Sequence, residues 1–165
     1  MKTTWPKLSF KEAQKTYETI HLWTQIVGKI RLVKMPWINH SWHVTLYVTP
    51  SGLTTSDVVA GDKDFQLDFD FIHHQLQLKT SAGDASSIDL KKLSVAGCYK
   101  QVLDALREVG IEADIYPVPN ELEDPIPFYK DETHATYNPD HATALHQALL
   151  RAHDVFTRFR AEFKG

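Results

Sequence analysis

The stretch Phe65-Gln-Leu-Asp-Phe-Asp-Phe-Ile-His-His-Gln-Leu-Gln-Leu-Lys-Thr80 decides the fold of this chain. Apolar and polar residues alternate on both sides of His73-His74, which is the period of a half-buried β-strand. A two-residue loop at these histidines sets the register, pairing Phe71 with Leu76 and Phe69 with Leu78. All four side chains then lie on one face, so register and hydrophobicity agree. The sequence therefore predicts an antiparallel hairpin over residues 65–80.

Further strands are expected on both sides of this hairpin. Before it, apolar residues occupy every second position from Trp42 to Val48, and the turn Pro50-Ser-Gly52 follows. After it, a turn at 81–84 leads into a short strand at about 88–90. Residues 111–118 are expected to form the last strand.

Three helices are predicted. Apolar residues recur every three or four positions from Phe10 to Val33, after the capping box Ser9-x-x-Glu12 and before Pro36. Gly28 leaves an alternative, in which it ends this helix and residues 29–35 form a strand. The second helix runs from Ser94 to Gly110, and the third from Asn138-Pro139 to about Phe163. The expected fold is one α+β domain over residues 1–165, with a mostly antiparallel sheet of four or five strands and three helices.

Composition excludes several classes of protein. The 165 residues include 18 Lys and Arg, 21 Asp and Glu, and one Cys, so the formal net charge is −3 and an internal disulfide is impossible. A weakly negative chain is not expected to bind nucleic acid. Its apolar stretches fall short of the roughly 20 residues of a membrane span, so we expect no membrane partner and a cytoplasmic location.

Several short motifs resemble one bacterial family. They are Trp5-Pro6, His21-Leu-Trp-Thr-Gln-Ile-Val-Gly-Lys29, Asn39-His-Ser-Trp-His-Val-Thr-Leu-Tyr-Val48, Gly52-Leu-Thr-Thr55, Phe69-Asp-Phe71, Asp124-Pro-Ile-Pro-Phe128 and His134-Ala-Thr-Tyr137. In this order they are similar to the family catalogued as domain of unknown function 5996. The resemblance implies a bacterial, cytoplasmic protein and supplies no activity, cofactor or catalytic residue. Longer members continue past Gly165, so we expect either a short relative or the N-terminal part of a longer architecture.

Histidine supplies the candidate metal ligands. His21 lies on a polar stripe of the first helix, one turn after Glu18, and His40 lies in the turn before the first strand. His134 stands beside Asp131 in a proline-rich acidic segment, which we call the strap (residues 117–139). A site made of His21, His40, His134 and Asp131 suits Zn²⁺ or Fe²⁺. Each of these residues also has a structural explanation, as a solvated polar residue or a loop histidine bonded to backbone.

Two functions from different classes follow. The first is a small-molecule or divalent-metal site near the polar stripe, the 39–43 turn and residues 124–137 of the strap, with ligand contacts from Trp23, Gln25, Asn39, Trp42 and Tyr137. The second is a non-catalytic protein-interaction module that uses the tryptophan-rich N-terminal region and the strap. No catalytic motif is present, so the sequence leaves open whether the protein is an enzyme.

Overall fold

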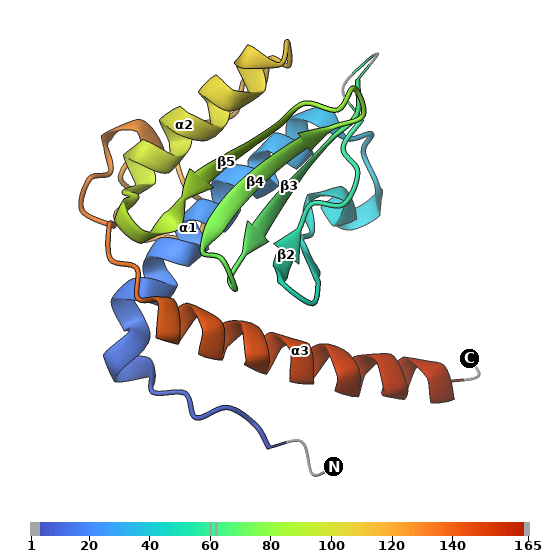
Figure 1. Cartoon of the computed structure of the whole chain (residues 1–165), viewed down its shortest axis with the longest axis vertical. Coiled ribbons are helices and arrows are strands. Elements are labelled where there is room, and N and C mark those ends of the chain that lie inside the picture. The colour runs from blue at the N-terminus through green and yellow to red at the C-terminus, as the bar shows by residue number, and fades with distance from the viewer. Residues whose placement is uncertain (1–3, 60, 62, 164–165) are drawn as a thin grey trace.

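A five-stranded antiparallel sheet forms the centre of the molecule (Figure 1). The computed structural model describes residues 4–59, 61 and 63–163. The strands pair in chain order: β1 Tyr47–Val48, β2 Gly52–Thr54, β3 Phe65–Asp70, β4 Gln75–Thr80 and β5 Ala85–Asp89. The helices are α1 Phe10–Lys34, α2 Val95–Glu108 and α3 Pro139–Glu162, with short 3₁₀-helices η1 Asn39–Val44, η2 Leu90–Lys92 and η3 Phe128–Lys130. The predicted α+β fold is confirmed.

The three long helices begin and end close to the predicted residues. α1 continues through Gly28, so the alternative that ended it there is wrong. Ser9 is its N-cap residue, although its side chain makes no capping hydrogen bond. Ser94 Oγ accepts from the Gly97 amide at the start of α2, and Asn138 caps α3 by accepting from two amides. The caps at Ser94 and Asn138 mark where α2 and α3 begin, because each side chain satisfies amides that the first helical turn leaves free.

The hairpin of β3 and β4 is present, but its predicted register is wrong. Phe69 pairs with Leu76 and Leu67 with Leu78, and a four-residue turn from Phe71 to His74 replaces the expected two-residue loop. Asp70 closes this turn, since its Oδ1 accepts from the backbone amides of Ile72 and His73, each at 2.8 Å. The shift is two residues, so the apolar side chains stay on the same face.

Two of the predicted strands do not form as expected. Residues 39–44 adopt the kinked helix η1, and only Tyr47 and Val48 remain of the strand predicted from Trp42. His43 Nδ1 accepts from the Ile38 amide and the guanidinium of buried Arg31 donates to the Thr45 carbonyl, so side chains replace the strand hydrogen bonds here. Residues 111–118 form no strand, although Ile111 and Ile115 are buried in the core.

One face of the sheet is covered and the other is open. α1 runs behind the sheet and α2 lies beside β5 (Figure 1). Fully buried residues from α1, α2 and the covered face form the core, among them Trp23, Ile26, Phe69, Leu76 and Cys98. Burial raises the pKa of the Cys98 thiol, as expected for a small core residue and not for a nucleophile.

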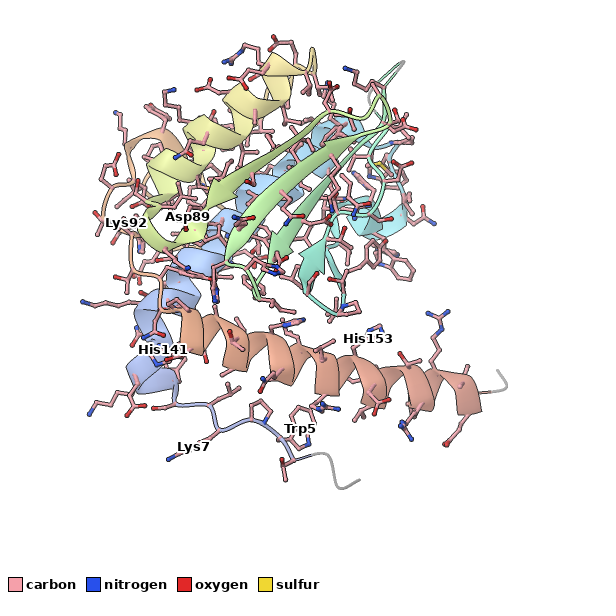
Figure 2. The ribbon with its side chains drawn as sticks, viewed as in Figure 1. Trp5, Lys7, Asp89, Lys92, His141 and His153 are labelled. Atoms are coloured by element: carbon pink, nitrogen blue, oxygen red, sulfur yellow. The ribbon has the colours of Figure 1, made fainter. Side chains whose placement is uncertain are left out.

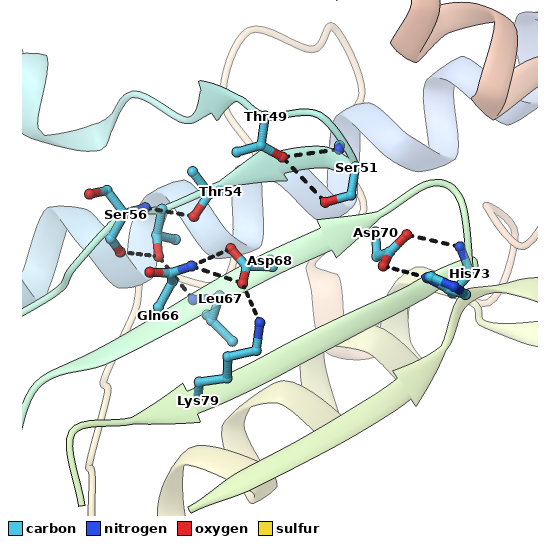
Figure 3. A network of polar contacts seen from close by, with 12 residues as sticks. Thr49, Ser51, Thr54, Ser56, Gln66, Leu67, Asp68, Asp70, His73 and Lys79 are labelled. Atoms are coloured by element: carbon cyan, nitrogen blue, oxygen red, sulfur yellow. Dashed lines mark hydrogen bonds and ion pairs between the residues drawn. The ribbon is translucent and has the colours of Figure 1, made fainter. Parts of the chain in front are cut away.

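The open face of the sheet is polar. On β3 and β4, Asp68 accepts from Gln66 Nε2 at 2.8 Å and from Lys79 Nζ at 3.2 Å, and Asp70 pairs with His73 at the turn (Figure 3). Polar side chains on alternate positions are typical of a sheet with one solvated face.

α3 crosses the lower edge of the sheet and extends beyond it (Figure 1). Hydrogen bonds tie its first half to the body, because His146 Nε2 donates to the Thr49 carbonyl at 2.9 Å and Thr143 Oγ1 donates to the Phe71 carbonyl at 3.3 Å. Just before α3, the buried Tyr137 hydroxyl bonds to His74 Nδ1 at 2.9 Å. Among the described residues, no helix combines the length and the apolar character needed to cross a membrane.

Candidate functional site

A groove runs along the polar stripe of α1. Its volume is about 830 Å³, within the range of pockets that hold small organic ligands. Side chains from α1, η1, β1, β2, α3 and the start of the strap line it. The groove includes the polar stripe of α1 and Ser41 of the 39–43 turn, which the sequence placed in the candidate site. No residue of 124–137 lines the groove, and the strap contributes only Asn120 and Glu121.

One side of the groove is polar, and we call it the polar wall (His21, Gln25, Lys29 and Asn120). Gln25 joins α1 to the strap, since its Nε2 donates to the Asn120 carbonyl at 3.1 Å and its Oε1 accepts from the Asn120 amide at 2.8 Å. Gln25 Nε2 also lies 3.2 Å from His21 Nε2. The polar wall is therefore a connected set of hydrogen-bonding groups held in place by backbone contacts.

Lys29 is the cation of the polar wall. Its Nζ donates to Asn120 Oδ1 at 2.6 Å and lies 5.3 Å from the centre of the Tyr116 ring. Within the described part of the chain, no carboxylate oxygen lies within 4.0 Å of this ammonium. Burial lowers the pKa of Lys29, because partial removal from water disfavours the charged form. An anionic group in the groove would meet a positive charge that no protein carboxylate already neutralises.

The side chains that line the groove from η1, from β1 and β2 with the residues before them, and from α3 are mostly aliphatic, and we call these the apolar wall (Val44, Leu46, Val48, Leu53 and Leu149). Val48 of β1 pairs with Leu53 of β2, so both side chains point to the same face of the sheet. At Gly28, η1 passes close to α1, and a Cβ there would lie 3.6 Å from the Val44 carbonyl oxygen. Gly28 therefore forms part of the groove floor, and a larger side chain would fill the space between the walls.

The five residues that the sequence predicted to contact a ligand do not lie together in the structure. Gln25 lies in the groove, whereas Trp23 and Tyr137 are buried in the core with their ring centres 5.5 Å apart. Asn39 and Trp42 are exposed on η1. Of the five residues predicted to contact a ligand, only Gln25 lines the groove.

The predicted metal ligands do not come together. His21 lines the groove, His40 is exposed on η1, and His134 and Asp131 lie in the strap. Across residues 4–59, 61 and 63–163, no three side chains of His, Cys, Asp or Glu are close enough to hold a metal ion.

Asp131 and His134 have a partnership of their own. Buried Asp131 accepts from His134 Nδ1 at 2.7 Å and, through its other oxygen, from the amides of Thr133 and His134. Asp70 and His73 repeat this arrangement at the β3–β4 turn (Figure 3). In both places the carboxylate holds a tight loop together by accepting hydrogen bonds from its backbone amides. This structural role explains why an acidic residue lies beside each histidine, and no metal ion is needed for it.

Sequence reasoning missed most of the residues that line the groove, among them Asn120, Lys29 and Leu149, which come from the strap, α1 and α3. Lys29 was not on the predicted stripe, although it lies four residues after Gln25, the spacing that puts two residues on one helix face. Nothing local to Asn120 or Leu149 indicates a site, because their roles depend on long-range packing.

Comparisons with known proteins give a family and no activity. A family model described as "Family of unknown function (DUF5996)" matches residues 5–165, which confirms the resemblance seen in the sequence. No curated protein and no solved structure shows significant similarity to the chain.

Proposed function

The chain belongs to the family of unknown function DUF5996, and from the geometry of the groove we propose that it binds an organic small molecule. The ligand has an apolar body and a head that accepts hydrogen bonds, preferably an anion. The observation that carries the proposal is the pairing of an aliphatic wall with a polar wall across one groove. Such pockets use apolar contact for affinity and a few placed polar groups for orientation.

Each part of the ligand has a counterpart in the groove. The apolar wall offers contact to a hydrocarbon chain or ring, and its burial supplies the driving force. Lys29 is the donor for the head, since its Nζ carries three N–H groups and makes one hydrogen bond, to Asn120 Oδ1, and its ammonium adds charge. Glu121, the neighbour of Asn120 in the chain, also borders the groove, so an acceptor head is expected to contact the Lys29 ammonium and to point away from the Glu121 carboxylate.

The test uses decanoate as a probe, followed through backbone amide shifts in two-dimensional NMR. We expect shifts at Gly28, Lys29, Val48 and Leu53, and weaker binding of decanol, which lacks the charge. Shifts confined to other parts of the chain would exclude the groove as the site. Equal binding of decanol would exclude Lys29 as the partner of an anionic head.

A filling variant makes the test specific. Gly28→Leu adds a side chain to the groove floor and is expected to weaken decanoate binding by about tenfold or more, equivalent to roughly 1.4 kcal/mol. Gln101→Leu places the same side chain on an exposed position of α2 and is expected to bind decanoate like the wild type. Undiminished binding by Gly28→Leu would contradict the proposal.

Exposed aromatic residues favour a second function, a protein-interaction surface. Trp37 and Trp42 are 70% and 68% exposed, and Ile38 and Tyr47 nearby in the chain are about half exposed. Large apolar side chains on a surface are typical of interaction sites. This function would be favoured over the first if decanoate caused no amide shifts at the groove residues and if a partner protein bound the wild type but not a variant that lacks Trp42.

A further inference from the structure

Seven apolar residues along α3 and its C-cap form one continuous stripe. Their spacing alternates between three and four, the pattern of positions a and d in a coiled coil. The stripe consists of Ala142, Leu145, Leu149, Ala152, Phe156, Phe159 and the C-cap residue Phe163. Its first part is in use, because Ala142 is fully buried, Leu145 packs against the core and Leu149 lines the groove.

The second part of the stripe has no partner within the described chain. Phe156, Phe159 and Phe163 are 69%, 70% and 72% exposed, and the neighbouring Val155 is 51% exposed. This part of α3, which carries His153, extends past the sheet with no element packed along it (Figures 1 and 2). The sequence pattern does not change where the packing ends, so the exposed half has the composition of a buried helix face.

We propose that this half of α3 pairs with the same segment of a second copy of the chain, as an antiparallel helix pair about a twofold axis. In such a pair an a residue of one helix faces a d residue of the other. Leu145 and Leu149 already contact the chain's own fold, so the pairing uses only the residues from Ala152 to Phe163. Phe156 then faces Phe159 of the second copy, and Ala152 faces Phe163 of the second copy. The small Ala152 thus leaves room for a phenylalanine ring at each end of the contact, which is how well-packed helices interdigitate.

The parallel arrangement fits less well. It sets Ala152 against Ala152 and Phe156 against Phe156, which leaves a gap at one level and crowds the next. Isologous contacts such as those of the antiparallel pair are the commonest form of homodimer.

Area and charge are compatible with a dimer. A buried aromatic residue covers about 150–250 Å², so the exposed apolar side chains offer on the order of 500 Å² per chain. Two such faces approach the lower limit of about 1,000 Å² for a specific interface. The ion pair between Asp154 and Arg158, with Nε and Oδ1 3.0 Å apart, lies outside the stripe and need not be broken.

Sedimentation equilibrium of the full chain tests the pairing. We expect a reversible dimer, and we expect Phe159→Glu to weaken it at least about tenfold because a charge enters the centre of the contact. The matched control is Trp37→Glu, which alters a side chain of equal exposure outside α3 and is expected to leave the dimer unchanged. A monomeric wild type, a dimer that survives Phe159→Glu, or a dimer lost in Trp37→Glu would each overturn the proposal.

Crosslinking tests the orientation separately. A mixture of the Phe156→Cys and Phe159→Cys variants is expected to form a mixed intermolecular disulfide on mild oxidation, whereas Asp154→Cys, on the far side of α3 from the stripe, is not expected to form one. The native Cys98 does not compete because it is fully buried. A disulfide that forms in the Phe159→Cys variant alone in preference to the mixture would overturn the antiparallel arrangement, since d residues face each other only in a parallel pair.

Discussion

The two sides of α1 differ in what surrounds them. One side carries Trp23, Ile26 and Ile30, which are fully buried against the rest of the core. The other side carries His21, Gln25, Gly28 and Leu32, which line the groove. The core side obtains its contacts from the folded chain itself, whereas the groove side retains hydrogen-bonding groups and apolar surface that the chain does not cover. We infer that the core side mainly stabilises the fold and that the groove side is available for binding.

The largest expected effect is a difference in stability between the two sides. Ile26→Ala removes a fully buried side chain and is expected to lower the free energy of unfolding by about 2–5 kcal/mol. Leu32→Ala, on the groove side, removes a side chain that is 45% exposed and is expected to cost less than about 1 kcal/mol. Urea denaturation of both variants measures the difference. An equal decrease in the free energy of unfolding of both variants would contradict the difference between the two sides of α1, because the groove side would then be as tightly packed as the core.

A smaller effect of opposite sign is expected at the groove floor. Gly28 is inside a helix, where glycine is less favourable than alanine by roughly 0.5–1 kcal/mol, and an added Cβ makes only an ordinary contact at 3.6 Å. Gly28→Ala should therefore raise the free energy of unfolding by about that amount. In α2, a Cβ on Gly97 would lie 3.2 Å from Ser94 Oγ, so Gly97→Ala should gain less in the same denaturation experiment. Destabilisation by Gly28→Ala would show that the groove side is closed at this point.

The smallest expected effect concerns the edge of the core side, where Trp23 contacts Tyr137 and Tyr137 bonds to His74. Burial, followed by the nearby charge of Lys91, lowers the pKa of His74 from its usual 6.5, although Asp70, Asp140 and Asp89 oppose the shift. The folded pKa lies below the unfolded one, so the unfolded chain binds the proton more readily. The contribution of His74 to stability is therefore present above the unfolded pKa and is lost as the pH falls through the folded pKa.

His74→Asn tests this contribution. Asparagine tolerates the left-handed backbone at this position, where φ is 59°, and it does not titrate. Unfolding measured from neutral to mildly acidic pH should show a shallower loss of stability in the variant than in the wild type. If the free energy of unfolding depended on pH in the same way in both proteins, His74 would make no pH-dependent contribution to stability.

Much of the fold follows from local patterns. The 3.6-residue period and the caps at Ser94 and Asn138 were sufficient for the helices, and alternation was sufficient for the central hairpin. The register was not predictable, because it depends on the Asp70 side chain closing a longer turn. η1 was not predictable either, since the guanidinium of Arg31 from α1 occupies the Thr45 carbonyl and alters the local preference.

The candidate site divides in the same way. The polar stripe with His21 and Gln25 is visible in the sequence, because residues three and four apart share a helix face. The expected metal site was not assembled, since His40 and His134 lie on elements that packing places away from the stripe. Asn120 and Leu149 entered the site through contacts between segments about 100 residues apart or more, and no local pattern reports such contacts.

The sequence by itself determined the family, the α+β class, the three helices, the central hairpin and the polar stripe of α1. Only the tertiary structure decided that this stripe faces an aliphatic wall, that Trp23 and Tyr137 belong to the core, and that the end of α3 has no partner within the described residues. The reason is physical. Periodicity and capping act within a few residues of each other, whereas a groove or a bare helix face depends on which distant segments fill the neighbouring space.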